Sequence, residues 1–379
     1  MITKIWVNNF KSLVDFDMQL SKFNCLVGLN GSGKSTVLQF LDFLSQLMIG
    51  DVGIWLATRH WKAADLNSKI SKKSNIDFQV TIEIDGRNIE WKGSFNRTSL
   101  SCTHESVVVN NEVLLNVEDG KFTVGSTTHD IIFNYEGSLL SALKDKKTYI
   151  DLTILRETLI DIRSLELLSP EILRSKARYS EGKLGIGGEN LSALIHESSS
   201  NIKENLIIGL KKIYPQIEDI KTKSLRSGWK QLEVIESFDG KKIISVARHV
   251  NDGMLRLMAI LFQIEIKKSF LLFDEIENGI NPELIEYLVD MLVGCDHQVM
   301  VTTHSPMILN YLEDDIAKKG VIYLYKNRKG ATQSIRLFDI PSMAKKLEFM
   351  GPGEAFVDTN LTSLSEEISG DYLIDQKGQ

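Results

Sequence analysis

Residues Gly28-Leu-Asn-Gly-Ser-Gly-Lys34-Ser35 form a complete G-x-x-x-x-G-K-[ST] pattern, which is typical of a phosphate-binding loop. Glycines let successive backbone N–H groups turn inward around a phosphate. In this pattern Lys34 supplies a positive charge to the β- and γ-phosphates of a nucleotide, and Ser35 supplies a hydroxyl group to Mg²⁺. The predicted nucleotide-binding residues of the loop are Gly28, Asn30, Gly31, Ser32, Gly33, Lys34, Ser35 and Thr36.

The segments on either side of the loop favour the same interpretation. Residues 22–27 form a short apolar run typical of a strand, and residues 36–47 carry apolar side chains at helical spacing. Strand, glycine loop and helix occur in the order that places phosphates at a helix N-terminus, where backbone N–H groups and the helix dipole favour an anion. The sequence therefore predicts a nucleotide site in an α/β protein.

Two later segments predict the hydrolytic part of this site. Residues 269–273 form a buried type of strand that ends at Asp274, which can hold Mg²⁺, and at Glu275, which can accept a proton from an attacking water. A second apolar strand, residues 297–303, ends at His304, and we expect this histidine to sense or polarise the γ-phosphate because the carboxyl ends of parallel strands face the ligand. The predicted catalytic residues are Glu275, His304 and Lys34, and the predicted metal ligands are Ser35 and Asp274.

A short polar turn, Asn251-Asp252-Gly253, precedes an apolar helical run. Its glycine and polar side chains would lie at a helix N-terminus, which is a second candidate anion site. Taken alone, the same residues are also what an ordinary helix cap requires. Both interpretations stay open on the residues themselves.

Composition restricts the class of protein. The chain has 379 residues, 43% of them hydrophobic and 25% charged, which is ordinary for a globular protein. Three widely spaced cysteines form no metal-binding pattern and suggest a reducing compartment. The N-terminus lacks a signal-peptide layout, and the longest apolar stretch is too short to cross a bilayer, so we expect a cytoplasmic protein without a membrane partner. The net charge of −6 does not favour a wholly basic nucleic-acid binder, although Lys221, Lys223, Arg226 and Lys230 form a local basic run.

The rest of the chain divides by residue pattern. Residues 49–75 look irregular and polar, residues 76–134 alternate as strands do, and residues 137–214 have helical spacing. Residues 217–247 again look like strands, and residues 360–379 look like a polar tail.

Together these motifs resemble an ABC-type ATPase head of the SMC/RecF/OLD class, and more closely the OLD-like "AAA-family" ATPases of bacteria. Asn8-Asn-Phe-Lys11-Ser12 resembles the N-terminal N-F-K-S strand of that class, and residues 251–256 resemble its S-D-G-x-x-R signature. Residues 274–282 resemble its Walker B and D-loop, and His304 matches its switch histidine. The resemblance covers nearly the whole chain.

The resemblance implies an α/β fold: an ABC-type P-loop ATPase head with a mixed β-sheet, an antiparallel β-subdomain and an inserted helical subdomain. The expected domains are an N-terminal ATPase lobe with Walker A and the β-subdomain (1–135), a helical insertion (136–216), a C-terminal ATPase lobe with the signature, Walker B and switch histidine (217–340), and a C-terminal helix with a polar tail (341–379).

The resemblance also implies how such a head works. It binds ATP with Mg²⁺, hydrolyses it, and forms a homodimer or a higher even oligomer in which two heads pack head to tail. Asn251, Asp252 and Gly253 would then act on the nucleotide of the partner, and Lys11 would approach a phosphate. Two features depart from the family pattern: Asn251 stands where serine is usual, and no glutamine is placed as the Q-loop residue.

Three functions follow from this resemblance. The leading one is an ATP-dependent switch that regulates a separate effector protein, a nuclease or toxin, in bacterial anti-phage defence, because the chain carries no nuclease motif after His304. The alternative is a RecF-like DNA repair or maintenance ATPase that binds DNA, which the basic run 221–230 favours slightly. A transporter ATPase is disfavoured because the signature lacks L-S-G-G-Q.

Overall fold

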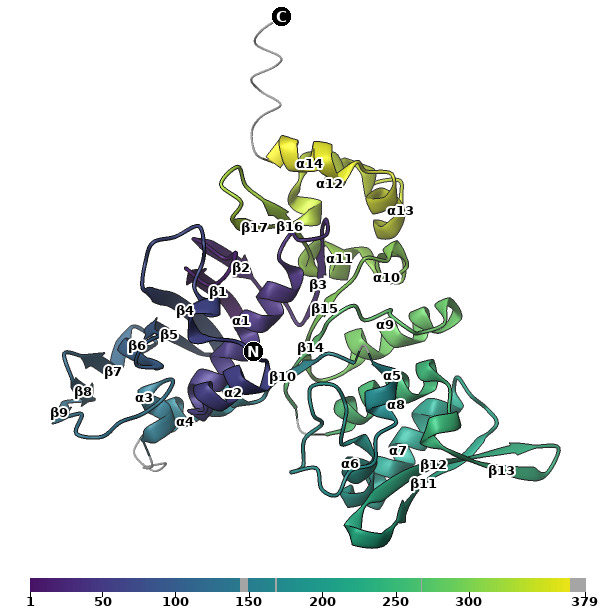
Figure 1. Ribbon diagram of the computed structural model, residues 1–379. Coiled ribbons are helices and arrows are strands. Elements are labelled where there is room, and N and C mark those ends of the chain that lie inside the picture. Colours follow the sequence, from purple (N-terminus) through teal and green to yellow (C-terminus); the bar gives the residue numbers. More distant parts are fainter. Residues whose placement is uncertain (144–148, 168, 267, 369–379) are drawn as a thin grey trace, which may run out of the picture. The chain divides into compact units, whose positions relative to one another are not determined.

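A computed structural model describes residues 1–143, 149–167, 169–266 and 268–368 of the chain (Figure 1). The chain forms two compact units: Met1–Arg163 together with Glu313–Gln379, and Ser164–Leu312. The four domain boundaries expected from the sequence stay predictions. None of the helices in the described ranges is both long enough and apolar enough to cross a membrane.

The first unit contains an eight-stranded antiparallel sheet with the strand order β2-β1-β4-β5-β6-β7-β8-β9. Its bounds are β1 Ile2–Asn8, β2 Phe16–Gln19, β4 Asn75–Ile84, β5 Arg87–Asn96, β6 Ser101–Val109, β7 Glu112–Glu118, β8 Lys121–Val124 and β9 Thr127–Asp130. Asp85-Gly86 and Asn110-Asn111 join consecutive strands, and all four residues have positive φ, as a two-residue hairpin turn of type I′ requires. The strand prediction for residues 76–134 agrees with this sheet.

The phosphate-loop strand of the same unit lies in a second set of strands. β3 (Phe23–Val27) is wholly buried and pairs in parallel with β16 (Val321–Lys326), which pairs antiparallel with β17 (Thr332–Arg336). The helices of the unit are α1 Lys34–Ile49, α2 Val52–Thr58, α3 Leu139–Ala142, α4 Ile150–Ile160, α11 Asp314–Gly320, α12 Pro341–Lys346, α13 Pro352–Val357 and α14 Leu361–Ile368, with 3-10 turns η1 Ala63–Leu66 and η5 Leu337–Asp339.

An aromatic cluster fixes α1 within the first unit. The ring of Phe43 on α1 lies 5.4 Å from the ring of Phe10 and 5.0 Å from the ring of Phe95 on β5. Phe10 also meets Phe40 one turn earlier on α1, edge to face. These four side chains are fully buried, so the helix that follows the phosphate loop has one fixed position against the sheet.

Three expectations about local structure were wrong. Residues 49–75 are not irregular throughout, because Trp55 and Leu56 are buried on the short helix α2. The predicted helical segment 137–214 contains the strand β10 (Ile162–Leu165). The predicted polar tail begins later than residue 360, since α14 buries Leu364, and the remainder of that tail lies outside the described residues.

In the second unit, β14 (Phe270–Phe273) pairs in parallel with β15 (Gln298–Thr302), and every residue of both strands is buried. Burial on both faces explains why these strands read as continuous apolar runs. The largely buried helix α8 (Asp252–Glu265) belongs to the same unit. The other helices of the unit are α5 Pro170–Leu173, α6 Leu191–Glu197, α7 Ser200–Lys211, α9 Ile285–Gly294 and α10 Pro306–Asn310, with 3-10 turns η2 Arg226–Gly228, η3 Ala247–His249 and η4 Pro282–Leu284.

A three-stranded antiparallel sheet completes the second unit. Its strands are β11 (Ile217–Ser224), β12 (Lys230–Phe238) and β13 (Lys241–Val246). β12 and β13 form a long hairpin that extends away from α6 and α7 (Figure 1). α6 packs on β11 and β12, and α7 packs on β11. The buried residues of these two strands are Ile217, Ile220, Leu232, Val234 and Ile235.

Candidate functional site

The loop after β3 has a backbone that only glycine can adopt at two positions. Gly28 has a φ of 146°, and a Cβ atom there would lie 2.3 Å from the carbonyl oxygen of Leu324. Gly33 has a φ of 113°, and its Cβ would lie 2.4 Å from the Oγ1 atom of Thr332. Both φ values and both contacts exclude a side chain, so the loop lies directly against β16 and β17.

Lys34 closes over this loop from the first turn of α1. Its Nζ atom donates hydrogen bonds to the carbonyl oxygens of Gly28 (3.0 Å) and Leu29 (3.2 Å), and the residue is 6% exposed. α1 has no side-chain cap at Gly33 and no acidic residue in its first turn. The positive end of a helix of 16 residues is therefore not neutralised by its own first turn.

The loop also holds a polar atom that needs a partner. The hydroxyl oxygen of Ser32 is buried and has no hydrogen-bond partner in the described parts of the chain. A buried hydroxyl without a partner costs free energy unless a ligand or water satisfies it. With the uncapped helix end and the glycine backbone, this hydroxyl fits a bound phosphate.

Thr332 on β17 supports the loop through a side-chain hydrogen bond. Its hydroxyl, fully buried, donates to the carbonyl oxygen of Ser32 (2.8 Å). The Oγ1 atom of Thr332 also lies 2.8 Å from the Oγ atom of Ser12, and it accepts a hydrogen bond of 2.8 Å from Nζ of Lys326. One donated and two accepted bonds satisfy the hydroxyl completely when Ser12 donates. Burial lowers the pKa of Lys326 below its usual value.

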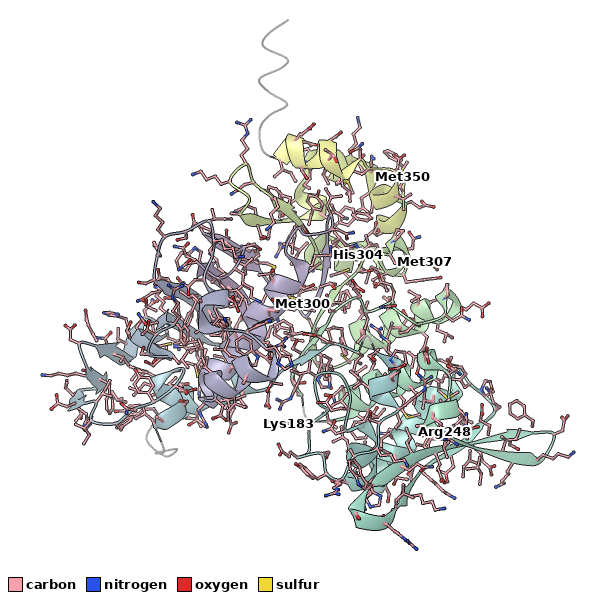
Figure 2. The ribbon with its side chains drawn as sticks, in the orientation of Figure 1. Lys183, Arg248, Met300, His304, Met307 and Met350 are labelled. Atoms are coloured by element: carbon pink, nitrogen blue, oxygen red, sulfur yellow. The ribbon has the colours of Figure 1, made fainter. Side chains whose placement is uncertain are left out.

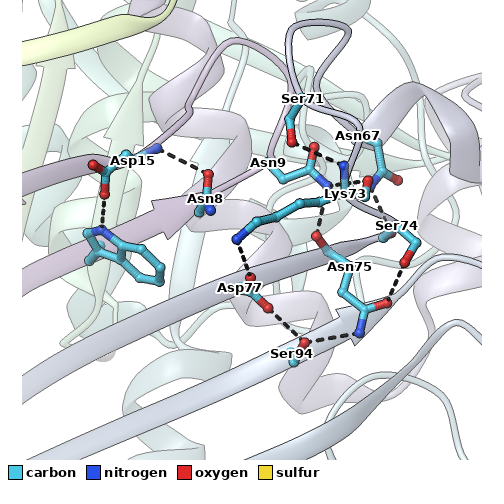
Figure 3. A network of polar contacts seen from close by, with 11 residues as sticks. Asn8, Asn9, Asp15, Asn67, Ser71, Lys73, Ser74, Asn75, Asp77 and Ser94 are labelled. Carbon is cyan, nitrogen blue, oxygen red and sulfur yellow. Dashed lines mark hydrogen bonds and ion pairs between the residues drawn. The ribbon is translucent and has the colours of Figure 1, made fainter.

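The segment Asn9–Ser12 is fixed on its other side by Asn9 (Figure 3). The Nδ2 atom of Asn9, which has a φ of 72°, donates to the carbonyl oxygens of Lys73 (2.8 Å) and Asn75 (2.7 Å). The Oδ1 atom of Asn9 accepts from the backbone N–H of Ser68 (3.1 Å). The residues between Asn9 and Ser12 are therefore held at both ends.

Lys11 lies in this held segment. Its Nζ atom donates to the Oε1 atom of Gln39 on α1 (2.7 Å) and lies 3.2 Å from the centre of the Trp61 ring. Gln39 is one helical turn after Ser35, so the ammonium group is anchored on α1 close to its N-terminal end. Its predicted approach to a phosphate stays a prediction.

In the second unit, Thr302 at the end of β15 organises the carboxylates that follow β14. Its hydroxyl donates to Oδ1 of Asp274 (2.5 Å) and accepts from the backbone N–H of Glu275 (2.8 Å). Glu275 has a φ of 46°, a conformation uncommon for a residue with a long side chain. The chain thus turns sharply at Glu275, and both carboxyl groups remain partly exposed.

Arg256 on α8 holds the backbone of the same turn. Its Nη2 atom donates to the carbonyl oxygens of Glu275 (2.6 Å) and Asp274 (3.4 Å), and the side chain is buried. Burial lowers the pKa of Arg256 to about 10, against the opposing effect of the nearby carboxylates of Glu277, Glu275 and Asp274. The arginine therefore keeps its charge at neutral pH.

Glu277 ties this turn to the segment that contains His304. Its Oε1 atom accepts from the backbone N–H groups of His304 (2.8 Å) and Ser305 (3.1 Å). The side chain of His304, labelled in Figure 2, is exposed after the end of β15. The structure therefore brings together Asp274, Glu275 and the backbone of His304 within the second unit.

The residues Asn251, Asp252 and Gly253 form the start of α8. The Oδ1 atom of Asn251 accepts from the backbone N–H of Met254 (2.8 Å), so this side chain is an N-cap, as the simpler interpretation of the sequence requires. Asp252 is paired with Arg174. A Cβ on Gly253 would lie 3.1 Å from the carbonyl oxygen of Gly279, so the signature turn packs closely on the D-loop of its own chain.

Sequence reasoning missed several of these residues. Thr302 stands in the apolar run before His304, and a hydroxyl at the end of a buried strand was the available signal. Arg256 and Glu277 lay within recognised motifs but had no assigned role. Thr332, which lies 300 positions after Ser32, follows no pattern that links it to the loop.

Two family models match the chain. One is described as "AAA ATPase domain" and matches residues 1–159. The other is described as "AAA domain, putative AbiEii toxin, Type IV TA system" and matches residues 118–310, just over half of the chain. Among curated proteins, an OLD nuclease from Thermus scotoductus (strain ATCC 700910 / SA-01) is 31% identical over 103 residues. That region is 27% of this chain and 18% of the nuclease, so the match spans less than a fifth of that relative.

Solved structures of SMC heads are similar in fold. An SMC head bound to the C-terminal winged-helix domain of ScpA aligns with a TM-score of 0.56 at 17% identity, over 88% of this chain and 96% of that one. An SMC head with an extended coiled coil, bound to the C-terminal domain of ScpA derived from Pyrococcus furiosus, has a TM-score of 0.55 at 14% identity, over 92% and 99%. The predicted α/β fold of the ABC-type P-loop ATPases is confirmed.

Proposed function

The chain belongs to the AAA-domain family whose model matches residues 118–310, and from this membership we propose that it is an ATP-hydrolysing switch of the SMC and OLD type. The observation that supports the proposal best is the loop Gly28–Ser35. It combines a backbone without room for side chains, an uncapped helix end and a buried hydroxyl without a partner among the described residues. Each of these properties suits a phosphate group.

Each residue of the predicted site has a role in such a switch. Backbone N–H groups of Gly31, Gly33 and Lys34 bind the phosphates, and the Lys34 ammonium exchanges its carbonyl partners for phosphate oxygens. Glu275 takes a proton from the attacking water, and His304 orients the terminal phosphate. The Ser35 hydroxyl and the Asp274 carboxylate would hold Mg²⁺, which when bound would offset negative charge on the phosphate oxygens. Both side chains offer oxygen ligands, the kind that Mg²⁺ prefers, and one or two such groups suffice beside nucleotide phosphates.

We further propose that two copies of the chain share each nucleotide. Asn251, Asp252 and Gly253 would contact the nucleotide of the partner, which suits their place at the positive end of α8, a helix of 14 residues. Because Asn251 caps α8 through its Oδ1 atom, its Nδ2 donors can serve a phosphate of the second subunit. This arrangement makes hydrolysis depend on dimerisation.

A mixture of inactive variants tests this shared site. We expect Lys34→Ala to lose ATP binding and Asp252→Ala to bind ATP without turnover. A mixture of the two should recover part of the activity, because one of the two sites in a mixed dimer then has an intact loop and an intact signature. Gly253→Asp is a poorer choice, because its side chain would displace the Gly279 carbonyl within the same subunit. No recovery above the sum of the separate variants would contradict the shared site.

The effector is the remaining part of the proposal. We propose that ATP-driven dimerisation regulates a separate protein, a nuclease or toxin, in defence against phage. The match to an OLD nuclease and the toxin–antitoxin description of the family support this direction. The similar SMC heads were solved with the partner protein ScpA, which supports a head that acts through a bound protein. Co-purification with the product of a neighbouring gene, with and without ATP, tests the assignment. A nuclease or toxin as the bound protein would support it, and a replication protein would favour the repair alternative.

A further inference from the structure

A cavity of about 740 Å³ opens on the surface of the second unit, and none of its lining residues is one of those assigned to ATP. The chain from Ser175 to Asn190 forms most of its wall, and Trp229 from the β11–β12 hairpin completes it. We call it the aromatic-basic pocket, after Lys176, Arg178, Tyr179, Lys183 and Trp229. No role in ATP hydrolysis has been given to these residues.

Hydrogen bonds within the chain hold the wall of the pocket in place. Asn190 accepts a hydrogen bond from the backbone N–H of Gly185 (2.8 Å) and donates to the carbonyl oxygens of Ser180 (3.2 Å) and Lys183 (2.7 Å). The N–H of Leu225 donates to the carbonyl oxygen of Trp229 (2.7 Å), which closes the hairpin turn. A binding surface that is ordered before its ligand arrives loses less entropy on binding.

Two aromatic rings are exposed in this pocket. Tyr179 is 68% exposed, and Trp229 is 39% exposed. The Arg178 guanidinium lies 4.9 Å from the centre of the Trp229 ring, a cation–π contact that orients both groups. Exposed aromatic and guanidinium faces are the surfaces on which unpaired nucleic-acid bases stack.

Positive charge surrounds these rings. Lys176, Arg178 and Lys183 are exposed, and within the described residues neither Lys176 nor Arg178 forms an ion pair. The carboxylates in the wall are Glu181 and Glu189, and Glu189 accepts from the N–H of Gly187 (3.1 Å). The pocket thus offers several separate cations, which suit a chain of phosphates.

The backbone of β12 meets the wall of the pocket at Lys230. The N–H of Lys230 donates to the carbonyl oxygen of Ala177 (2.7 Å), and its side chain points to the same face of the hairpin as Ser224. Lys223 pairs with Gln231 and therefore projects from the opposite face, and Lys221 is paired with Asp219. The basic run 221–230 is therefore not one continuous track.

We propose that the aromatic-basic pocket binds single-stranded nucleic acid, with bases stacked on Tyr179 and Trp229 and the backbone phosphates near Lys176, Arg178 and Lys183. A duplex would not fit, because its bases are already stacked on one another. The pocket shares no lining residue with the site assigned to ATP, and this role goes beyond the ATP-dependent switch.

Fluorescence anisotropy of a labelled 15-nucleotide oligodeoxythymidine, titrated with the full chain without ATP, tests the proposal. Three neutralised phosphates give a slope of about −2 for the logarithm of the binding constant against the logarithm of the salt concentration. We expect Trp229→Ala and Tyr179→Ala each to weaken binding about 5- to 150-fold, which is the loss of one stacked base. Trp229→Phe should restore most of the affinity. Lys176→Ala should reduce the slope by about 0.7.

Two control variants distinguish this pocket from binding elsewhere on the chain. Lys241→Ala changes an exposed lysine that pairs with Phe238, at the opposite end of β12 from Trp229, and should leave affinity unchanged. Lys34→Ala should also bind the strand as the unchanged chain does, so a failure of the ATP proposal would not affect this result. Unchanged binding in both Trp229→Ala and Tyr179→Ala would overturn the proposal. Equal affinity for a duplex of the same length, or competition by free thymidine monophosphate at equal concentration, would overturn it as well.

Discussion

Arg256 donates a hydrogen bond to the backbone carbonyl oxygen of Glu275 over 2.6 Å, and this bond joins the first turns of α8 to the end of β14. The signature segment and the proposed catalytic base are therefore connected within one chain. Gly253, three residues before Arg256, packs on the carbonyl of Gly279 in the same loop. Any displacement of the start of α8 would act on the backbone on both sides of Glu277.

Arg256→Met should destabilise the second unit and slow turnover. The substitution keeps most of the side-chain volume but leaves the Glu275 carbonyl without its charged donor, which costs about 2 kcal/mol. Urea unfolding followed by circular dichroism measures this loss. The matched control is Arg226→Met, at an exposed arginine of the same unit. Its free energy of unfolding should stay within about 0.5 kcal/mol of that of the unchanged chain. An equal effect of the two substitutions would contradict the role of the Arg256 bond.

Glu275→Gln should keep ATP binding and lose turnover. The amide preserves the shape of the side chain but cannot accept the proton of water, so we expect a rate lower by about 10²- to 10⁴-fold. Hydrolysis is measured by phosphate release, and size-exclusion chromatography with ATP should show a stable dimer. Glu283→Gln, an exposed change nearby in the sequence, should hydrolyse normally. Turnover at the normal rate in Glu275→Gln would mean that another group is the base.

Thr332→Val should weaken ATP binding although Thr332 lies far from the phosphate loop in the sequence and meets it only in the fold, at Ser32 and Gly33. Valine has nearly the shape of threonine, but it removes the donor to the Ser32 carbonyl and the acceptor for Lys326. We expect a loss of about tenfold in ATP affinity, equivalent to about 1.4 kcal/mol. Thr332→Ser retains the hydroxyl and should bind ATP normally. Calorimetric titration with both variants checks the difference, and matching affinities would rule out the supporting role.

Glu105 predicts a pH dependence of stability in the first unit. This buried carboxyl group accepts from Trp91 Nε1 (3.1 Å), Ser138 Oγ (2.5 Å) and the Leu139 N–H (2.6 Å). Burial raises the pKa of Glu105 from 4.5 to about 7, although these three hydrogen bonds oppose the shift. Between these two pKa values the folded state holds more protons than the unfolded state, so stability falls as the pH rises.

Glu105→Gln removes this dependence. From pH 4.5 to about 7, the unchanged chain should lose about 3 kcal/mol relative to the variant, because one pKa unit corresponds to about 1.4 kcal/mol. Thermal unfolding of both proteins at several pH values measures the difference. Glu118→Gln, an exposed change on the neighbouring strand β7, should follow the unchanged chain. Parallel curves for Glu105→Gln and the unchanged chain would contradict the raised pKa.

The sequence predicts local motifs well and long-range supports poorly. The phosphate loop follows from a spacing of glycines, and the buried strands before Asp274 and His304 follow from continuous apolar runs. Those patterns are local, because backbone conformation and burial on both faces of a strand restrict which residue types can occupy neighbouring positions.

The residues that support the loop from distant parts of the sequence show no such local pattern. A threonine on an edge strand is ordinary, and only the fold brings Thr332 against Ser32. The helix α2 was missed because its seven residues are too few for a clear apolar period, and only packing shows that Trp55 is buried. Likewise Arg178 and Trp229 are 51 positions apart, and the stacked pair forms only when β12 meets the chain at Ala177.

The pairing of β3 with β16 has a consequence for synthesis of the protein. β3 and the phosphate loop are translated some 300 residues before their partner strand and Thr332. Until then, the loop has neither the Leu324 carbonyl nor the Thr332 hydroxyl against which its glycines pack. A nascent chain therefore cannot complete this loop, and the fully formed loop marks a chain whose translation has passed β17.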